Sequence, residues 1–364
     1  MTNYTFPVTR TTTPRPRPAD PANPGFAKYF TDHMFVMDYD AGQGWHDGRI
    51  VPHQPFLIEP ASSVLHYAQT MFEGMKAYKT PDGQIQIFRP DMNIARMKRT
   101  CERLCIPELP DGLMLAALEQ LLKVDADWMP SGSNTSMYIR PFIFANQSTI
   151  SVTPANKYCF MIILAPTGSY YAENNAGLGT APIFVEDEYI RAAPGGTGYA
   201  KVGGNYAGGM RASLKAYEYS CNDVLWLDAV EHKYVEEIGT SNAFFVIDGE
   251  VITAPLTSGT ILPGITRDSV IKLLTKWGVK VSERRLAIDD VLAAAKDGRL
   301  SEVFASGTAA VISPIGRLTY KGENYVISEG KVGPIAQKVY DNLYGMQTGV
   351  VEDDMGWTYK IKLD

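Results

Sequence analysis

The run GGTGYAKVGGNYAGG, residues 195–209, carries the clearest signal in this chain. Seven of its fifteen residues are glycine, and Lys201 is its only charged residue. Glycine tolerates positive φ and lets backbones approach closely, so this density predicts a shaped loop rather than a helix or strand. A lysine in such a loop is a candidate for chemistry, because a neutral amine forms a Schiff base with a carbonyl compound.

Two nucleotide-binding motifs are excluded by their spacing. From Gly196, the dinucleotide pattern requires a third glycine where Lys201 stands. A P-loop requires Gly-Lys-Ser/Thr, whereas Lys201 follows Ala200 and precedes Val202. A surface lysine in a flexible loop remains the structural alternative, and the loop alone does not separate it from a reactive amine.

Length and composition indicate a globular protein. The chain has 364 residues and a net charge of −6, with 45% hydrophobic and 20% charged residues. Such a length suits two domains or one large one. No basic surface is indicated, which argues against nucleic acid and anionic membranes as partners. The longest apolar run, residues 158–166, is too short to cross a bilayer and predicts a buried strand.

The cysteines and histidines show no metal-binding or hydrolase pattern. The four cysteines form no C-x-x-C pair, and no secretory signal peptide is recognisable, which favours reduced thiols in the cytoplasm. The five histidines lack the spacing of metal ligands, and no serine lies in a G-x-S-x-G elbow. We therefore expect a cytoplasmic protein without a metal site.

The order of elements predicts an α+β chain with two domains. Residues 1–24 are rich in Thr, Pro and Arg and predict an extended or disordered arm. We expect a smaller N-terminal α/β domain over 25–166, an interdomain linker over 167–181 and a larger C-terminal domain over 182–364.

Periodicity and turn signals predict the individual elements. Strands 136–145 and 157–166 are rich in β-branched and aromatic residues and should be neighbours in a sheet. Asp82-Gly83 and Asp248-Gly249 are typical of hairpin turns. Further strands are expected at 223–228, 280–286 and 302–308, and helices at 92–104, 113–128, 205–219, 266–277, 289–296 and 334–344.

An aldehyde cofactor with a phosphate group would need an anion site. Pro263-Gly264 precedes Thr266 at a predicted helix start, where backbone amides attract phosphate; a simple N-cap is the alternative for Thr266. Thr308 ends a strand among small residues, but it could be only a turn residue. Arg96 could neutralise the phosphate, although an arginine on a helix is by default solvated.

Two more groups could serve the ring of such a cofactor. Glu237 stands before a glycine at the start of an apolar stretch, where a carboxylate would be partly buried and would need a cation. A protonated ring nitrogen would satisfy it, but so would a structural ion pair. Tyr206, five residues after Lys201, could reach the same cofactor, or it could simply pack in the core.

Taken together, the chain resembles the branched-chain-amino-acid aminotransferases, which are pyridoxal-phosphate enzymes of fold type IV. The resemblance covers nearly the whole chain. It implies two domains with mixed sheets and flanking helices, and a cofactor at the domain interface. The blocks that carry it are LHYAQTMFEGMKAY (65–78), FRPDMNIARM (88–97), MYIRPFIF (137–144), GYAKVGGNY (198–206), EEIGTSNAFFV (236–246), LPGITRDS (262–269) and SGTAAVISP (306–314).

The resemblance implies roles for the candidate cofactor residues. Lys201 would form a Schiff base with pyridoxal 5'-phosphate and then move the substrate proton. Glu237 would hold the pyridine nitrogen protonated, and Tyr206 would bind the ring oxygen. The remaining matches would hold the phosphate. The full cofactor-binding set is Arg96, Lys201, Tyr206, Glu237, Ile265, Thr266 and Thr308.

The resemblance also implies a substrate pocket and a homodimer. An apolar wall would accept Leu, Ile or Val, and Arg140 would pair the second carboxylate of glutamate. Ile150 and Val152 match a loop that reaches the neighbouring subunit's active site. The substrate-binding matches are Phe26, Tyr67, Phe72, Tyr138, Arg140, Tyr170, Thr240 and Ala309.

The implied activity is transamination of L-leucine, L-isoleucine and L-valine with 2-oxoglutarate. An alternative is another enzyme of the same fold, a D-amino-acid aminotransferase or an aminodeoxychorismate lyase, against which the MYIRPFIF block argues. An alternative of another class is a non-catalytic ligand-binding protein in which Lys201 is only a surface amine.

Overall fold

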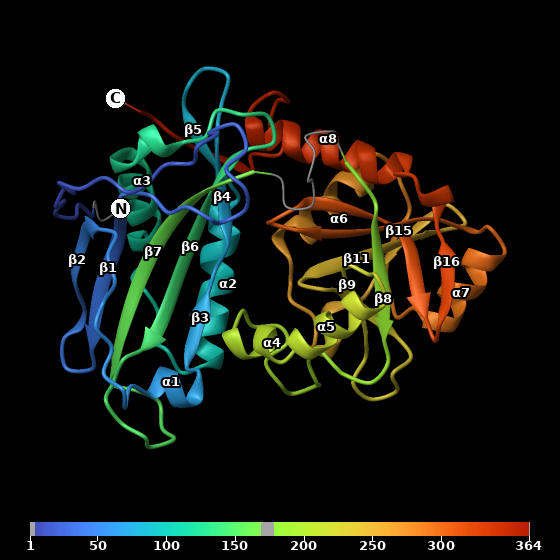
Figure 1. Cartoon of the computed structure of the whole chain (residues 1–364), viewed down its shortest axis with the longest axis horizontal. Coiled ribbons are helices and arrows are strands. Elements are labelled where there is room, and N and C mark those ends of the chain that lie inside the picture. The colour runs from blue at the N-terminus through green and yellow to red at the C-terminus, as the bar shows by residue number, and fades with distance from the viewer. Residues whose placement is uncertain (1–3, 169–177, 364) are drawn as a thin grey trace. The chain divides into compact units, whose positions relative to one another are not determined.

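A computed structural model of the chain describes residues 4–168 and 178–363 (Figure 1). The chain divides into two compact units, each with helices and strands, as expected for an α+β protein. The first unit comprises Met1–Tyr170, Lys201–Gly203 and Met346–Asp364, and the second comprises Tyr171–Ala200 and Gly204–Gly345. The C-terminal end thus belongs to the first unit, whereas the sequence suggested one domain over 182–364. Most of the expected linker, residues 169–177, lies outside the described residues.

The first unit is built on one antiparallel sheet. Its strand order is β17, β5, β4, β6, β7, β1, β2, and β3 pairs with β6 beside β4. The predicted pairing of β6 with β7 is confirmed, and it runs from Ser136 opposite Thr167 to Ala145 opposite Tyr158. The strands are β1 (His33–Asp40), β2 (Gly44–Pro52), β3 (Thr70–Phe72), β4 (Met75–Lys79), β5 (Ile85–Phe88), β6 (Ser136–Ala145), β7 (Lys157–Thr167) and β17 (Thr358–Ile361).

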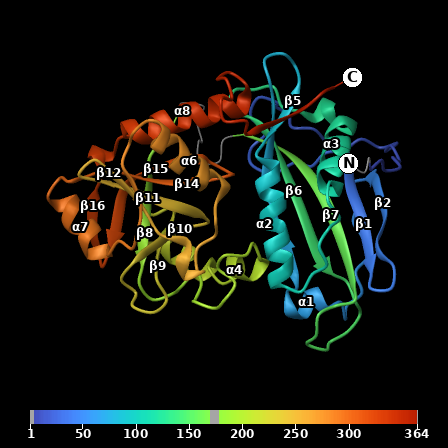
Figure 2. The same cartoon turned by 180° about the vertical axis from the view of Figure 1, so that it is seen from behind.

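Two helices, α2 (Pro90–Arg103) and α3 (Leu113–Val124), cover one face of this sheet (Figure 2). Their apolar side chains form one core with the odd-numbered residues of β6, because side chains alternate between the faces of a strand. Phe142 and Phe144 belong to a separate cluster on the other face. Tyr138 and Arg140 share that face and point away from the helices. The short helices α1 (Ser63–Tyr67) and η1 (Ala126–Trp128) complete the unit.

Both chain ends are attached to this sheet. Residues 4–24 are irregular, with bends at 12–13 and 19–20 and a turn at 21–22, and Phe6 is buried in the core. The amide of Thr9 donates to the carbonyl of Ile50 at 2.9 Å, beside a parallel bridge between Val8 and Ile50. At the other end, β17 pairs with β5 and buries Ile361.

The second unit is built on a closed barrel. Strands β10, β9, β8, β15, β14 and β11 pair in that order, and β11 pairs again with β10. The predicted turn at Asp248-Gly249 is confirmed between β11 and β12. The strands are β8 (Ala181–Glu186), β9 (Asp223–Leu227), β10 (Val235–Ile238), β11 (Ser241–Ile247), β12 (Glu250–Thr253), β13 (Val281–Glu283), β14 (Leu300–Gly307), β15 (Val311–Tyr320) and β16 (Glu323–Val326).

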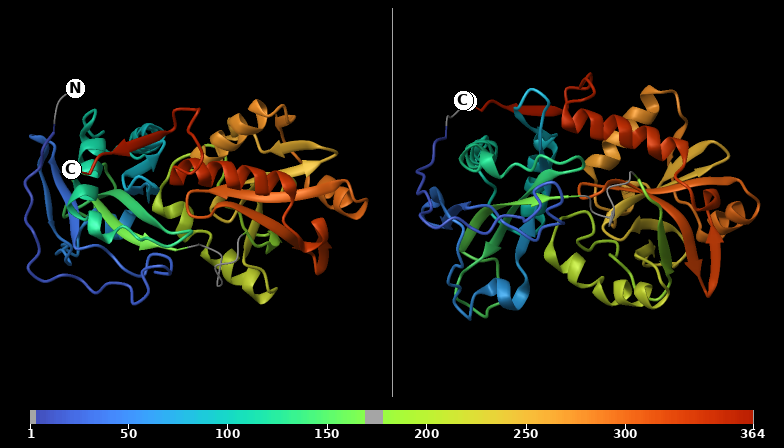
Figure 3. Two further views of the ribbon diagram at one scale, coloured as in Figure 1. Left: turned by 90° about the horizontal axis from the view of Figure 1, so that it is seen from above. Right: turned by 45° about the horizontal axis from the view of Figure 1, so that its top comes forward.

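One predicted helix of this unit is divided. The expected helix 205–219 is in fact α4 (Gly203–Ala207) and α5 (Met210–Glu218), because Gly208 and Gly209 between them are poor helix formers. The expected strand 280–286 is also shorter, since β13 pairs only with β12. The other helices are η2 (Leu256–Ser258), α6 (Ile265–Lys276), α7 (Ile288–Lys296), η3 (Ser328–Gly330) and α8 (Pro334–Thr348), the long red helix of Figure 3. Within the described ranges, no helix has the length and apolar character needed to cross a bilayer.

Candidate active site

Lys201 lies against strand β3 and helix α2 of the first unit. Its ammonium nitrogen is 4.7 Å from the ring centre of Phe72, and its carbonyl accepts the Phe72 amide at 3.2 Å. Its own amide donates to the hydroxyl of Thr100 on α2 at 3.1 Å. Main-chain bonds on both sides therefore fix the backbone of Lys201, and the lysine is only partly exposed. These contacts argue against the alternative of a surface lysine in a flexible loop.

Arg96 is buried and paired. The guanidinium donates from Nε and Nη2 to the two carboxylate oxygens of Glu73, both at 2.8 Å, and Asn93 donates to the same carboxylate at 2.7 Å. Burial alone would raise the pKa of Glu73, but the charge and hydrogen bonds of Arg96 hold it below its usual value. The default expectation of a solvated arginine is wrong for Arg96, although it holds for the exposed Arg99 and Arg103.

Four predicted substrate residues lie together on the sheet face that points away from α2 and α3. The guanidinium carbon of Arg140 lies 4.6 Å from the ring centre of Phe72 and 5.3 Å from that of Tyr138. Its Nη2 donates to the Tyr138 hydroxyl at 3.1 Å. Phe26 packs edge-on against Tyr138, with the ring centres 5.5 Å apart. The arrangement combines an aromatic surface with one cation.

The other predicted substrate residues of the first unit are more dispersed. The hydroxyl of Tyr67 donates to the carbonyl of Ile150. Ile150 and Val152 are 69% and 81% exposed, so this loop presents apolar side chains to solvent. Tyr170 lies outside the described residues.

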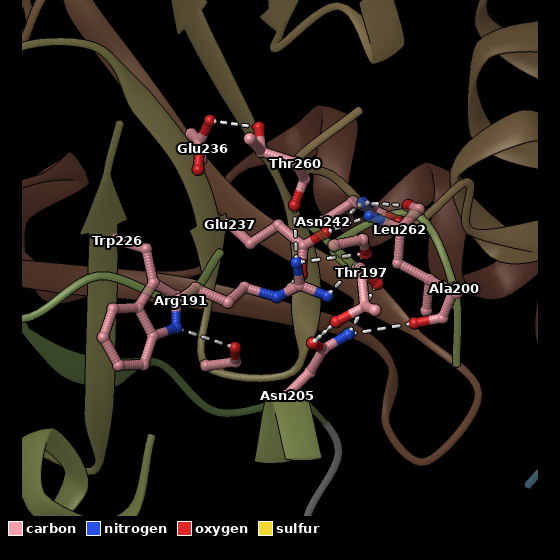
Figure 4. Close-up of polar contacts among 12 residues, drawn as sticks. Arg191, Thr197, Ala200, Asn205, Trp226, Glu236, Glu237, Asn242, Thr260 and Leu262 are labelled. Carbon is pink, nitrogen blue, oxygen red and sulfur yellow. Dashed lines mark hydrogen bonds and ion pairs between the residues drawn. The ribbon is translucent and has the colours of Figure 1, made fainter. Parts of the chain in front are cut away.

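Glu237 is the centre of a buried polar cluster in the second unit (Figure 4). Its side chain is 2% exposed, and Oε2 pairs with Nε of Arg191 at 2.8 Å. Oε1 accepts the amide of Leu262 at 2.7 Å and the side-chain amide of Asn242 at 3.4 Å. The structural ion pair that the sequence left open therefore exists.

The glycine-rich loop before Lys201 is held by side chains of the same unit. Asn205 donates to the carbonyls of Thr197 and Ala200 at 2.8 and 3.0 Å. Gly198 lies so close to Thr260 that a Cβ atom there would be 2.3 Å from the Thr260 carbonyl oxygen. Only glycine permits this approach, which explains one of the glycines in the run.

The two predicted phosphate turns lie near Asn242. Its side chain donates to the carbonyl of Leu262 at 2.9 Å, just before α6 begins, and it is opposite Ser306 at the end of β14. The N-cap of α6 is Gly264, so the alternative that Thr266 is a simple N-cap is wrong. The first amides of α6 and the hydroxyl of Ser306, which is buried with no protein partner among the described residues, are donors suited to an anion.

The other predicted cofactor and substrate residues of the second unit lie in turns or in a short helix. Thr240 is exposed in the turn between β10 and β11. This turn requires Gly239, whose φ is +55° and where a Cβ atom would be 1.9 Å from Asp223 Oδ2. Tyr206 is half-buried in α4, and Thr308 and Ala309 are half-buried in the turn after β14.

Sequence reasoning missed three residues that hold these groups in place. Glu73 and Asn242 lie inside apolar blocks, where a polar side chain is expected to have a specific partner. Arg191 precedes the glycine-rich loop by only a few residues, and this proximity is its local signal. Among residues 4–168 and 178–363, no cluster of His, Cys, Asp or Glu has the geometry to hold a metal ion.

Comparison with known proteins identifies the family. Residues 70–318 match the family described as Amino-transferase class IV. The chain belongs to the class IV aminotransferases. It is 49% identical to branched-chain-amino-acid aminotransferase 2 of Bacillus subtilis over 99% of this chain and 98% of that protein. It is 44% identical to the branched-chain-amino-acid aminotransferase of Mycobacterium tuberculosis over 93% and 92%. The predicted membership of the branched-chain enzymes is thereby confirmed.

Solved structures agree with this assignment. The Escherichia coli branched-chain amino acid aminotransferase superposes with a TM-score of 0.76 at 27% identity, covering 91% of this chain and 99% of the other. The T.th. branched-chain amino acid aminotransferase, solved with pyridoxamine 5'-phosphate, has a TM-score of 0.73 at 28% identity, covering 90% and 98%. The fold is type IV, and the cofactor of the family is pyridoxal 5'-phosphate.

The residues present fit this cofactor. A phosphorylated pyridine aldehyde needs an amine, an anion for its ring nitrogen and donors for its phosphate. Lys201 would provide the amine, and Glu237, a buried carboxylate paired with Arg191, would provide the anion. The first amides of α6 and the buried hydroxyl of Ser306, which has no hydrogen-bond partner among the described residues, would provide donors for the phosphate.

Proposed function

We propose that this enzyme transfers the amino group of L-leucine, L-isoleucine and L-valine to 2-oxoglutarate, giving branched-chain 2-oxo acids and L-glutamate. The observation that carries the proposal is the cluster of Arg140 with Phe72, Tyr138 and Phe26. Aromatic faces accept a branched aliphatic side chain, and a single guanidinium at their edge pairs with the second carboxylate of glutamate. One pocket can then serve both substrates.

Lys201 is the catalytic residue in this proposal. When bound, pyridoxal 5'-phosphate supplies an aldehyde and an electron-accepting ring. The amine of Lys201 would hold the cofactor through its aldehyde and would serve as the base that takes the proton from the substrate α-carbon. The fixed backbone of Lys201 limits where its Nζ can reach, which suits a proton transfer over a short distance.

The remaining candidates hold and orient the cofactor. The carboxylate of Glu237 would accept a hydrogen bond from the protonated ring nitrogen, and the hydroxyl of Tyr206 would donate to the ring oxygen. Arg96, whose guanidinium plane is fixed by Glu73, supplies positive charge for the phosphate. The amides of Ile265 and Thr266 and the hydroxyl of Thr308 supply further donors. By the family resemblance, Tyr67, Thr240 and Ala309 would contact the substrate, as would Tyr170, which lies outside the described residues.

The enzyme acts as a homodimer in the cytoplasm in this proposal. Exposed apolar side chains at Ile150 and Val152 support a loop that covers the neighbouring subunit's site, since such side chains are better buried. The four cysteines are free thiols, which suits a reducing compartment.

Substitution of Lys201 tests the proposal directly. Lys201→Ala is expected to abolish steady-state transamination, because the catalytic amine is removed, while the near-UV circular dichroism stays unchanged. Lys272→Ala is the matched control, because this lysine of α6 forms an exposed pair with Asp268. In the wild type, L-leucine should bleach the visible absorbance of the bound cofactor, and 2-oxoglutarate should restore it.

Three outcomes would contradict the proposal. Undiminished turnover of Lys201→Ala would exclude its catalytic role. Bleaching by D-leucine but not L-leucine would indicate a D-amino-acid aminotransferase of the same fold. A purified protein that stays colourless after incubation with pyridoxal 5'-phosphate would indicate a non-catalytic binding protein.

A further inference from the structure

We propose that Arg191 is a positioning residue that keeps Glu237 ionised and ties it to the loop leading to Lys201. The inference rests on the proposed function, in which Glu237 accepts the ring nitrogen of the cofactor. It assigns to Arg191 two separable tasks, one electrostatic and one mechanical, and both follow from contacts within the second unit.

The electrostatic task follows from a buried ion pair. Nε of Arg191 lies 2.8 Å from Oε2 of Glu237, and the two side chains are 6% and 2% exposed. With Oε1 bound to the amide of Leu262 at 2.7 Å, both carboxylate oxygens have fixed donors. A carboxylate held at both oxygens cannot rotate freely, so it presents one geometry to a ligand.

The charge of Arg191 also affects whether a proton shared by Glu237 and the ring nitrogen of the cofactor stays on the carboxylate or on the nitrogen. A cation at hydrogen-bond distance favours the ionised carboxylate over the protonated acid. When Glu237 faces a ring nitrogen, the shared proton therefore remains on the nitrogen. Glu236, the next residue, is under the same charges: burial first, and then the charge of Glu237, raise the pKa of Glu236, whereas the charge of Arg191 lowers it.

The mechanical task follows from the other nitrogens of the same guanidinium. Nη1 donates to the carbonyl of Thr260 at 2.6 Å (Figure 4). Nη1 and Nη2 also both lie 3.3 Å from the carbonyl of Gly198. Gly198 precedes Lys201 by three residues in the chain, and Thr260 precedes Leu262 by two. One side chain thus holds the carboxylate, the segment that donates to it and the loop before the catalytic lysine.

The test uses two variants. Arg191→Met removes both the positive charge and the several N–H donors of the guanidinium. Arg191→Lys keeps a positive charge but loses the planar set of donors that contacts Glu237, Thr260 and Gly198 together. Arg299→Met is the control, because this arginine of the same unit forms exposed pairs with Asp248 and Asp297. Two quantities are measured. One is the dissociation constant of pyridoxal 5'-phosphate, from titration of cofactor-free protein. The other is the ¹⁵N chemical shift of the ring nitrogen in ¹⁵N-labelled cofactor.

Arg191→Met is expected to raise the dissociation constant of the cofactor by about tenfold or more, which corresponds to the loss of one hydrogen bond to a charged group. It should also move the ring nitrogen signal toward that of an unprotonated pyridine. Arg191→Lys should restore most of the signal but not the affinity. A side chain that only stabilised the fold would leave the nitrogen signal unchanged. Arg191→Lys, which retains the buried charge, carries the test if Arg191→Met does not fold.

Glu237→Gln separates this inference from the proposed function. If Glu237→Gln leaves the ring nitrogen signal unchanged, the proposed role of Glu237 fails, and the inference fails with it. If Glu237→Gln moves the signal but Arg191→Met does not, Glu237 keeps its role and only the inference is overturned. Wild-type affinity in Arg191→Lys would overturn the mechanical task.

Discussion

At the scale of single residues, the buried carboxylates of this enzyme differ in their partners. Glu73 and Glu237 each face a buried arginine at 2.8 Å. Glu236 has no such cation among the described residues. One of its oxygens accepts the Thr260 hydroxyl, and Oε2 is buried without a hydrogen-bond partner in the same described ranges. The two paired carboxylates suit a role as anions, whereas Glu236 is costly to ionise.

The burial of Glu236 predicts that the free energy of unfolding depends on pH. Burial raises the pKa of Glu236 to about 6, with a smaller contribution from the charge of Glu237. Because the folded pKa lies above the unfolded value near 4.5, the neutral side chain favours folding at low pH. That contribution is present below about pH 4.5 and is lost as the pH rises through about 6. A shift of this size corresponds to at most about 2 kcal/mol.

Glu236→Gln is therefore expected to raise the free energy of unfolding at pH 8 by up to about 2 kcal/mol, with little gain near pH 4.5. Urea unfolding at both pH values measures the difference. Glu329→Gln provides the comparison, because Glu329 is an exposed partner of Lys331 and should show almost no pH-dependent change. A gain for Glu236→Gln that is equal at both pH values would contradict this explanation.

The position of Arg140 predicts that its removal lowers kcat/KM more for the dicarboxylic substrates than for leucine. Arg140→Ala removes the guanidinium beside Phe72 and Tyr138, so kcat/KM for glutamate and 2-oxoglutarate should fall by about 100-fold or more. Leucine carries no side-chain charge and should lose less than about tenfold. Steady-state kinetics with both amino acids measure the split. Arg49→Ala, which removes a half-exposed partner of Asp38, should affect neither substrate, and equal losses for Arg140→Ala would reject the shared pocket.

At the scale of elements, the C-terminal strand completes the sheet of the first unit. β17 covers the edge of β5 through the pairs from Thr358 opposite Phe88 to Ile361 opposite Ile85. Ile361 is 1% exposed and joins the core that α2 and α3 form with the sheet. Trp357 packs edge-on against Phe88 just before the strand. The last residues of the chain thus stabilise a unit whose other strands come from its first half.

Ile361→Ala is expected to lower the free energy of unfolding by about 2 kcal/mol or more, because it leaves a cavity in the core. Lys360→Ala, at the exposed neighbouring position of the same strand, should change it by less than about 0.5 kcal/mol. Urea unfolding of both variants provides the measurement. Similar values for the two substitutions would mean that β17 frays and contributes little.

At the scale of the whole molecule, the proposed dimer makes each active site depend on two chains. The loop with Ile150 and Val152 is exposed, while Lys201 is fixed on the first unit of its own chain. A defect in the loop and a defect in the lysine should then complement each other when they are carried by different subunits.

Co-expression tests this arrangement. A subunit with Lys201→Ala is combined with one carrying both Ile150→Asp and Val152→Asp, and the mixed dimer is isolated with two affinity tags. One of its two sites has an intact lysine and an intact loop from the partner, so about half of the wild-type activity should return. Activity no higher than that of the parent variants would show that the loop does not serve the neighbouring site.

Local patterns in the sequence predicted many of the elements and the identity of the chemical groups. Strands β6 and β7, the β11–β12 hairpin and helices α6 and α7 follow from periodicity and turn residues, which act over a few neighbouring positions. Lys201 and Glu237 were recognisable for the same reason. A lone charge among glycines and a carboxylate at the start of an apolar stretch are local anomalies.

Only the tertiary structure showed what surrounds these groups. The pairing of Arg96 with Glu73, the contacts of Arg191 with Glu237 and Gly198, and the addition of β17 to the first sheet join residues far apart in the chain. No local pattern distinguishes Arg96 from the exposed Arg99 and Arg103 on the same helix. A charged side chain is costly to bury unless it is paired with an opposite charge or with hydrogen-bond donors or acceptors. Which residue becomes its partner depends on how the whole unit packs, and a local sequence pattern does not contain that information.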